Sequence, residues 1–473
     1  MYDTIIIGAG MSGLAAGIRL AYYDQRVCLL ERHNTIGGLN SFYRLRGRDY
    51  DVGLHALTNF TPKGARKGPL ARLLRQLRFR WEDFSLSPQL ESSIRFPGVS
   101  LRFGNDFELL RSEVARAFPS ERENFDRLCA AIVDYDDLDE ATYQLSGREV
   151  VGGLIRDPLL LEMLFCPLMW YGNARERDMD FGQFCIMFRS IFSEGLARPI
   201  AGVRLILKNL VRRFRELGGE LKLRSGVQRI LTDGDRAIGV ELDGGEQILG
   251  RRILSSAGWV ETMRLCGSPT SVERAAGRMS FVESISVLDC TPQQLGHDQT
   301  IVFYNDSPQF HWERCDDLCD VRTGVVCSPN NFLYGDSDQT DRHLPDGVMR
   351  ITTIANYDRW RGLSEDEYLR QKVRWYDRAV ESAVRFVPDF RRHVIDTDVF
   401  TPRTIERFTW HQGGTVYGAP DKQLDGRTHL SNLFICGTDQ GFVGIVGAII
   451  SGISIANQHC LREPDAANPP QDG

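Results

Sequence analysis

The chain has 473 residues, of which 42% are apolar and 25% are charged. This ordinary globular composition is long enough for two domains, and it excludes disorder, collagen-like repeats and a coiled coil as the main architecture. The 57 basic and 63 acidic residues give a net charge of −6, so no overall basic surface predicts a nucleic-acid partner.

The cysteines and the two ends of the chain indicate the cellular compartment in which we expect the protein. The eleven cysteines are scattered, and the nearest pair, Cys315 and Cys319, lacks the further ligands of a zinc site. We therefore expect reduced thiols and no metal. A strand is predicted at the N-terminus itself, which leaves no room for a targeting peptide. Residues 441–456 are apolar but rich in glycine and short for a membrane span, so they favour a buried helix and a cytoplasmic protein.

The first residues follow the pattern of a dinucleotide-binding strand, turn and helix. Residues 2–7 (YDTIII) are predicted to form a buried parallel strand that runs into GxGxxG. Gly8 would permit the tight turn, Gly10 would let the backbone approach a pyrophosphate, and Gly13 would let the helix pack on the sheet. The helix N-terminus would then direct free N–H groups towards the phosphates.

A second strand strengthens this prediction. Residues 26–30 (RVCLL) read as that strand, and Glu31 follows where an acidic side chain can accept from ribose hydroxyls. The alternative is a plain βαβ unit that uses its glycines only for packing.

A distant segment indicates which dinucleotide is bound. Residues 433–436 are predicted to form a strand, followed by Gly437 and Asp439 and then by a helix that begins near Gly444. A carboxylate at a strand end beside a helix N-terminus suits the ribityl chain and the electron-rich edge of a flavin. The alternative for Asp439 is an N-cap of the following helix.

Several segments resemble one family. The opening GAGMSGLAAGIRL with ERHNTIGG, and the closing strand, GTD and helix, resemble the flavin amine oxidase superfamily. Residues 401–409 and 414–418 are similar to the late motif of its phytoene desaturases, carotenoid isomerases and retinol saturases. In YDVGLHALTNF (residues 50–60), Asp51, Gly53 and His55 match the retinol saturase pattern.

The resemblance implies an α/β fold with two parts. One is a discontinuous Rossmann-like FAD-binding domain of the glutathione-reductase type, and the other is a substrate domain with a mixed sheet and covering helices. It also implies noncovalent FAD, because no cysteine stands where covalent members attach the cofactor. The residues expected to bind FAD are Gly8, Gly10, Ser12, Gly13, Glu31, Arg32, Gly38, Leu39, Val227, Gly437, Asp439, Gly444, Ile445 and Val446.

The matched segments predict the domain boundaries. The FAD-binding domain should comprise residues 1–75, 196–262 and 400–460. The substrate domain should comprise residues 76–195, which are mostly helical in pattern, and residues 263–399, where strand-like runs precede a helix near 365–387. Residues 461–473 read as a disordered tail.

Residues 63–80 combine seven basic side chains with leucines at helical spacing, from Leu70 to Leu77. A basic amphipathic helix can lie in a membrane interface, and the isoprenoid substrates of the family live in bilayers. We therefore expect peripheral contact of this segment with the inner face of the membrane. The alternative is a surface helix that packs its leucines on the core.

Two residues are candidates for catalysis. His55 is suited to acid–base catalysis near neutral pH. The alternative is that His55 is structural and that other residues satisfy its hydrogen bonds. Arg407 would face the flavin or a substrate carboxylate, or else form a surface or interdomain ion pair.

The function expected from these features is FAD-dependent desaturation, saturation or isomerisation of a lipophilic isoprenoid or polyene by hydride transfer at flavin N5. The second electron partner stays open between a quinone, O₂ and external NAD(P)H. One alternative is an amine oxidase for a small amine, which would need a short aromatic pocket. Another is a protein in which FAD is purely structural. A long apolar tunnel that opens near Leu70–Leu77 would favour the lipid.

Overall fold

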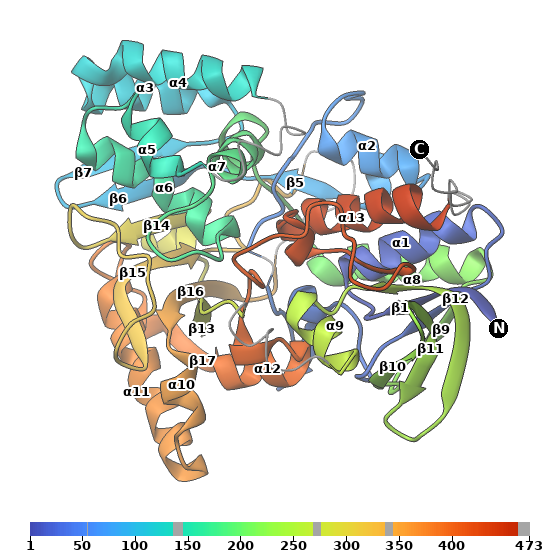
Figure 1. Ribbon diagram of the computed structural model, residues 1–473. Coiled ribbons are helices and arrows are strands. Elements are labelled where there is room, and N and C mark those ends of the chain that lie inside the picture. The colour runs from blue at the N-terminus through green and yellow to red at the C-terminus, as the bar shows by residue number, and fades with distance from the viewer. Residues whose placement is uncertain (54, 136–144, 268–275, 336–343, 462–473) are drawn as a thin grey trace.

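The computed structural model describes residues 1–53, 55–135, 145–267, 276–335 and 344–461. Its two large sheets lie in opposite halves of the molecule, each with covering helices (Figure 1). Apart from Leu461, the expected tail lies outside the described residues. Among the described helices, none combines the length and the apolar character that crossing a membrane requires.

The first sheet is parallel at its centre, with β1 between β2 and β12. β9 pairs in parallel with β2, β18 pairs in parallel with β12, and an antiparallel β10–β11 hairpin extends the sheet beyond β12. The last four residues of β1 and all of β2 are buried, as interior parallel strands require. The strands are β1 (Tyr2–Ile7), β2 (Val27–Leu30), β9 (Glu220–Lys222), β10 (Val227–Asp233), β11 (Arg236–Leu242), β12 (Gln247–Ser255) and β18 (Leu433–Ile435).

Three helices, α1 (Met11–Ala21), α8 (Val203–Glu216) and α13 (Gly444–Ile455), share an apolar core with the first sheet. α1 and α13 approach so closely that a Cβ at Gly452 would lie 2.0 Å from the carbonyl oxygen of Ser12. The small residues of α13 therefore serve close helix packing, which confirms the expected buried helix.

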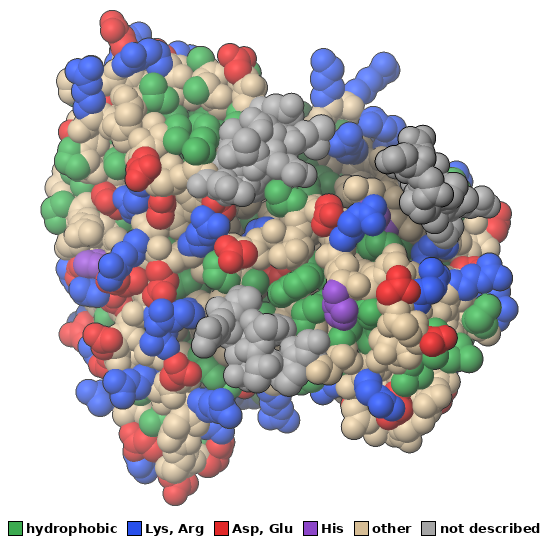
Figure 2. All heavy atoms as spheres, in the orientation of Figure 1, with side chains coloured by type: hydrophobic (Ala, Val, Ile, Leu, Met, Phe, Trp, Pro, Cys, Tyr) green, Lys and Arg blue, Asp and Glu red, His purple; other side chains and the backbone are tan. Residues whose placement is uncertain are grey.

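Helix α2 (Pro69–Gln76) corrects one expectation about the membrane. Its leucines face the protein core: Leu70, Leu73 and Leu77 are fully buried and Leu74 is 7% exposed. These leucines are therefore not available for insertion into a bilayer. The alternative interpretation, a surface helix that packs its leucines on the core, is correct for the apolar face of this helix. Lys and Arg side chains gather on the surface over this helix (Figure 2).

The second sheet is antiparallel except where β14 pairs in parallel with β6. Its order is β17-β13-β16-β15-β14-β6-β7. The segment 76–195, which was expected to be mostly helical, thus contributes two strands that turn at Pro97 and Gly98. The strands are β6 (Ser92–Phe96), β7 (Val99–Phe103), β13 (Ser280–Leu288), β14 (Ile301–Asn305), β15 (Cys319–Cys327), β16 (Gly347–Ala355) and β17 (Val394–Phe400).

Helices cover both faces of the second sheet. On one face they form a large core rich in phenylalanine, and on the other α11 packs against β15 and β16. The expected helix near 365–387 is α11. The helices of this half are α3 (Phe107–Ala117), α4 (Arg122–Asp134), α5 (Gly147–Gly152), α6 (Pro158–Gly172), α7 (Phe181–Phe188), α10 (Tyr357–Arg361) and α11 (Glu365–Ala383).

Short elements join the two halves. Tyr43 in the hairpin β3 (Phe42–Leu45)–β4 (Arg48–Asp51) donates a hydrogen bond to Asp398 of β17 at 2.7 Å. α12 (Pro402–Thr409) lies between the halves near α9 (Trp259–Leu265) (Figure 1). A short ladder of β5 (Leu86–Pro88) with β8 (Ala197–Pro199) adds a further link.

The strands of the two sheets come from different parts of the chain. All strands of the first sheet lie within 1–75, 196–262 and 400–460, and those of the second lie within 76–195 and 263–399, except that β17 ends one residue later, at Phe400. The hairpin β3–β4 nevertheless packs on the second sheet. The division into domains stays a prediction.

Candidate active site

A cleft opens where the parallel strands of the first sheet end. Gly8 follows β1, Glu31 follows β2, Gly258 lies just after β12, and Gly437 lies just after β18; all four line the cleft. The carboxyl ends of parallel strands are where α/β sheets bind ligands, because loops and helix N-termini converge there.

The first glycines have different tasks. Gly8 has φ +96°, and a Cβ there would lie 2.6 Å from Oγ of Ser256, so the turn requires glycine. A Cβ at Gly10 would meet nothing within 4 Å, because this backbone faces the open cleft. A Cβ at Gly13 would lie 2.1 Å from the carbonyl oxygen of Gly8, so its role is packing.

Glu31 and Arg32 are held in place at the cleft wall. The buried carboxylate of Glu31 accepts hydrogen bonds from the backbone N–H groups of Ala9 at 2.9 Å and His33 at 3.0 Å. Arg32 donates to the carbonyl of Val227 at 3.1 Å, and its guanidinium lies 4.2 Å from the ring centre of Trp410. Both acceptor and cation are thus oriented before any ligand binds.

Asp439 is buried in the cleft wall. Its carboxylate accepts from the backbone N–H groups of Trp259 at 2.6 Å and Ala419 at 2.8 Å. Helix α13 begins after Val443 with no side-chain cap, so the alternative that Asp439 is its N-cap is wrong. Nζ of Lys422 also lies 3.7 Å from Oδ1 of Asp439, so this carboxylate has three partners among the described residues. An ionised carboxylate has about four acceptor positions, so it keeps capacity for a ligand hydroxyl.

Most of the predicted cofactor residues line this cleft. Gly444 and Ile445 line the neighbouring cavity instead, while Gly13 and the fully buried Val446 are not in the lining of either. Those in the cleft are Gly8, Gly10, Ser12, Glu31, Arg32, Gly38, Leu39, Val227, Gly437 and Asp439.

Sequence reasoning missed a wall of the cleft. His33 lines it with a buried Nε2 atom that has no hydrogen-bond partner among the described residues. Trp410 and His411, which follow α12, line it too. Gly258, shortly after the strand-like residues 247–255, was a usable signal, but nothing local marks the residues after α12.

A second cavity of about 190 Å³ adjoins the cleft. The two share Leu39, Asn40, Thr438 and Ala448 as lining residues, so a ligand in the cleft can present one end to the cavity. The cavity walls are mainly apolar and aromatic. They include Ala56, Trp170, Tyr171, Phe281, Val325, Phe400, Ile405, Val416, Tyr417 and Val443.

One corner of this cavity is charged. Nε2 of His55 lies 3.4 Å from Oε1 of Glu283 and 3.1 Å from Oγ1 of Thr352. Glu283 accepts from the buried Arg350 at 2.6 Å and from the Thr352 hydroxyl. Arg350 also donates to the carbonyl of Val52 at 2.6 Å. The other ring nitrogen of His55, Nδ1, is buried with no hydrogen-bond partner among the described residues.

This arrangement sets the protonation of His55. Burial alone would lower the pKa of His55, but the charge of Glu283 outweighs it and raises the pKa to about 9. Burial opposes ionisation of Glu283 too, yet Arg350 and His55 hold its pKa at about 2. At neutral pH the corner therefore holds an imidazolium, a carboxylate and a guanidinium.

The structure does not bring Arg407 to this corner. Arg407 is exposed, is not in the cavity lining, and lines a separate groove on the outer side of α12. The two catalytic candidates therefore lie in different places, and only His55 faces the cavity.

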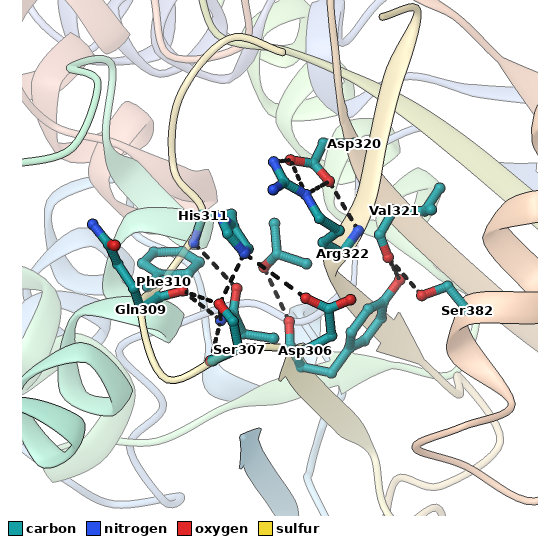
Figure 3. A network of polar contacts seen from close by, with 12 residues as sticks. Asp306, Ser307, Gln309, Phe310, His311, Asp320, Val321, Arg322 and Ser382 are labelled. Carbon is teal, nitrogen blue, oxygen red and sulfur yellow. Dashed lines mark hydrogen bonds and ion pairs between the residues drawn. The ribbon is translucent and has the colours of Figure 1, made fainter. Parts of the chain in front are cut away.

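Two other polar clusters show no catalytic arrangement. In the loop after β14 (Figure 3), Nε2 of His311 lies 2.9 Å from Oγ of Ser307 and 3.8 Å from Asp306. A relay would need the acid on the other ring nitrogen, and the Ser307 hydroxyl bonds the carbonyl of Gln309. At the β13–β17 edge, Nδ1 of His393 lies 2.9 Å from exposed Asp289, close to Cys290.

Comparison with known proteins identifies the family of the chain. The family model described as flavin containing amine oxidoreductase matches residues 11–458. The chain belongs to this family. It is an FAD-dependent oxidoreductase, and the residues of the cleft fit that cofactor: Gly10 leaves room for a pyrophosphate, and Glu31 and Asp439 offer acceptors to sugar hydroxyls.

Curated relatives match nearly the whole chain at low identity. Prolycopene isomerase of Arabidopsis thaliana is 24% identical over 97% of this chain and 82% of its own. All-trans-retinol 13,14-reductase of Danio rerio is 22% identical over 98% and 87%. Phytoene desaturase (lycopene-forming) of Pseudescherichia vulneris is 25% identical over 85% and 86%. The resemblance seen in the sequence is confirmed.

Solved structures agree on the fold. An oxidoreductase from Methanosarcina mazei has a TM-score of 0.65 at 16% identity, covering 96% of this chain and 100% of its own. Putrescine oxidase bound to putrescine has a TM-score of 0.63 at 15% identity, covering 98% and 99%. The predicted α/β fold, a Rossmann-like part beside a mixed sheet with helices, is confirmed.

Proposed function

We propose that this protein saturates or isomerises an apolar isoprenoid polyene, with His55 as its proton donor. The observation that carries the proposal is the corner described above: a histidine held by Glu283 in an apolar cavity that adjoins the FAD cleft. The relatives named for prolycopene, retinol and phytoene support a polyene as the substrate class.

The division of labour follows from the residues. FAD, when bound, supplies or accepts a hydride. The aromatic walls orient the polyene and exclude water, and His55 holds a proton at the charged corner. Saturation needs a proton beside the hydride, and isomerisation is helped by transient protonation. Desaturation needs a group that removes a proton, for which an imidazolium is the wrong form, so we rank desaturation third.

The size of the cavity limits how the substrate sits. Ligand pockets usually measure about 300–1,000 Å³, whereas this cavity measures about 190 Å³. It holds a segment of a polyene rather than a whole carotenoid, so a long substrate requires its walls to separate. A long apolar tunnel opening near Leu70–Leu77 would have favoured a lipid, but the described residues do not form one there, because those leucines are packed in the core.

We further propose that FAD is bound noncovalently. Cys436 lines the cleft, so a thiol is present, but burial raises its pKa to about 12. A protonated thiol is a poor nucleophile towards a flavin. Acid denaturation should therefore release yellow flavin into the supernatant, and flavin retained in the pellet would contradict this assignment.

The test of the substrate class uses anaerobic holoenzyme. Photoreduced enzyme is mixed with a cis-configured tetraterpene, and the products are separated by chromatography. Reoxidation of the flavin with a saturated product supports reduction, and a trans product with the flavin still reduced supports isomerisation. His55→Gln should slow either reaction about 10²–10⁴-fold while keeping FAD. Bleaching of oxidised enzyme by the polyene would indicate desaturation instead.

A small amine is the second candidate. The observation in its favour is the cavity itself, which is short and aromatic, with Trp170, Tyr171, Phe281 and Tyr417 in its walls. A panel of primary amines mixed with oxidised holoenzyme tests it directly. Flavin reduction by an amine, with no reaction of any polyene, would replace the first proposal by this one.

A further inference from the structure

The outer side of α12 carries a groove that the proposed function does not use. It measures about 1140 Å³ and is the larger neighbour of the FAD cleft, with which it shares Arg32, Phe408 and Trp410. Arg407 lies here. Helix α12 thus lines the cavity with Ile405 and lines this groove with Arg403, Thr404, Glu406, Arg407 and Phe408.

The charge of the groove is strongly positive. Seven arginines and three acidic residues line it. Each acid has a partner: Asp358 pairs with Arg314, Glu365 accepts from Arg403 at 2.9 Å, and Glu406 accepts from a tyrosine hydroxyl. Two of the arginines also pair with acids outside the lining, Arg278 with Glu176 at 3.0 Å and Arg32 with Asp243 at 3.7 Å. The positive charge that these pairs leave over lies mainly on Arg361 and Arg407.

Two of the arginines have no ion pair with any described residue. Arg361 at the end of α10 and Arg407 in α12 are both exposed, and the guanidinium of Arg407 lies 5.5 Å from the ring centre of Phe408. Arg403 is paired through one nitrogen, while its Nη1 atom is buried and lacks a hydrogen-bond partner among the described residues. A buried guanidinium nitrogen without an acceptor is costly unless a ligand supplies one.

Aromatic rings are interleaved with these cations. The guanidinium of Arg403 lies 4.2 Å from the ring centre of Tyr368, and that of Arg32 lies 4.2 Å from that of Trp410. Such stacking fixes the plane of a guanidinium and leaves its edge free for two parallel hydrogen bonds. The planar edge of arginine matches the oxygens of a phosphate group.

We propose that this groove is a binding site for a phosphate-bearing ligand with at least two negative charges, contacted by Arg361, Arg403 and Arg407. The ligand could be a free diphosphate compound such as a nucleotide, or the headgroup of an anionic lipid. Both present the same chemistry to the arginines. Arg32 and Trp410 line both the groove and the FAD cleft, so a ligand that extends to them would share this wall with FAD.

The test compares Arg361→Ala/Arg407→Ala with wild type, both as FAD-saturated holoenzyme so that the cleft cannot take the probe. Inorganic diphosphate and ADP are titrated by calorimetry at low salt. Phosphatidylcholine vesicles with or without phosphatidic acid are tested by flotation. The matched control is Arg374→Ala/Arg392→Ala, which removes the same charge at exposed positions outside the groove. The flavin-to-protein ratio shows that each variant is folded.

We expect binding to weaken at least about tenfold in the groove variant and to stay within about twofold in the control. Loss of diphosphate or ADP binding identifies a soluble ligand, and loss of flotation alone identifies a lipid headgroup. Three outcomes would overturn the proposal. The groove variant could bind the probes as wild type does, both variants could lose binding equally, or wild type could bind none of the probes.

Discussion

The FAD cleft and the substrate cavity share a wall, yet they are shaped by different parts of the protein. In the cleft, backbone does most of the shaping: the turn at Gly8, the open face of Gly10 and N–H groups that fix Glu31. In the charged corner of the cavity, side chains from separate segments hold one another, and His55 lies 297 residues from Thr352. The cleft should therefore tolerate changes of side-chain charge better than the cavity, which has no backbone substitute for Glu283.

The largest expected effect comes from removing the charge at the centre of that corner. Glu283→Gln leaves Arg350 buried without its carboxylate, which should lower the free energy of unfolding by about 3–5 kcal/mol. Denaturant titration measures it. Glu241→Gln, in an exposed pair with Arg229, is the control and should change little.

A second variant sharpens this test. Adding Arg350→Met to Glu283→Gln removes both buried charges, so part of the lost stability should return. If the single variant were as stable as wild type, the corner would not be held by its charges, and the contrast with the cleft would fail.

The next effect is the pH dependence of stability. The pKa of His55 is about 9 in the folded protein and near 6.5 when unfolded, so protonated His55 stabilises the fold. That contribution, on the order of 3 kcal/mol, is complete below about pH 6.5 and is lost as the pH rises towards 9. Unfolding midpoints of wild type and His55→Gln should therefore converge over this range. A constant gap between the two curves would show that His55 stays neutral; exposed His429→Gln serves as the control.

The contrast between the regions also explains what could be predicted from the sequence. Gly8, Gly10, Glu31 and the strand before Gly437 could be predicted, because backbone geometry restricts residue type within a short segment. The partners of His55 could not, because they depend on the pairing of β13 with β16, which places Glu283 opposite Thr352. No local pattern encodes that register. Likewise, the leucines of α2 had the spacing for a membrane face, and only the packing on α13 shows that they face inward.

Two glycine variants test the claim that backbone shapes the cleft. Gly8→Ala forces a side chain into a positive φ and against Ser256, which should destabilise the fold by about 1–3 kcal/mol. Gly10→Ala meets open space, so the apoprotein should unfold as wild type does. It should nevertheless lose FAD, because its methyl group occupies the approach of the pyrophosphate. Thermal unfolding of the apoproteins and FAD titration separate the two effects. If Gly10→Ala kept full FAD affinity, the pyrophosphate would have to bind at another place than Gly10.

The weakest interaction we predict is contact of α2, outside both regions, with a membrane. Its leucines are packed in the core, so any contact with a membrane rests on the basic side chains alone, at about 1 kcal/mol each near an anionic surface. Such contact is weakened by salt, because the screening length is about 8 Å at physiological ionic strength. Reversing Arg72, Arg75 and Arg78 to Glu should abolish any flotation with anionic vesicles at low salt and leave FAD content unchanged. Leu73→Ala should instead lower stability by about 2–5 kcal/mol without changing flotation. Flotation that resists high salt and requires Leu73 would show that the leucines leave the core, contrary to the packing seen here.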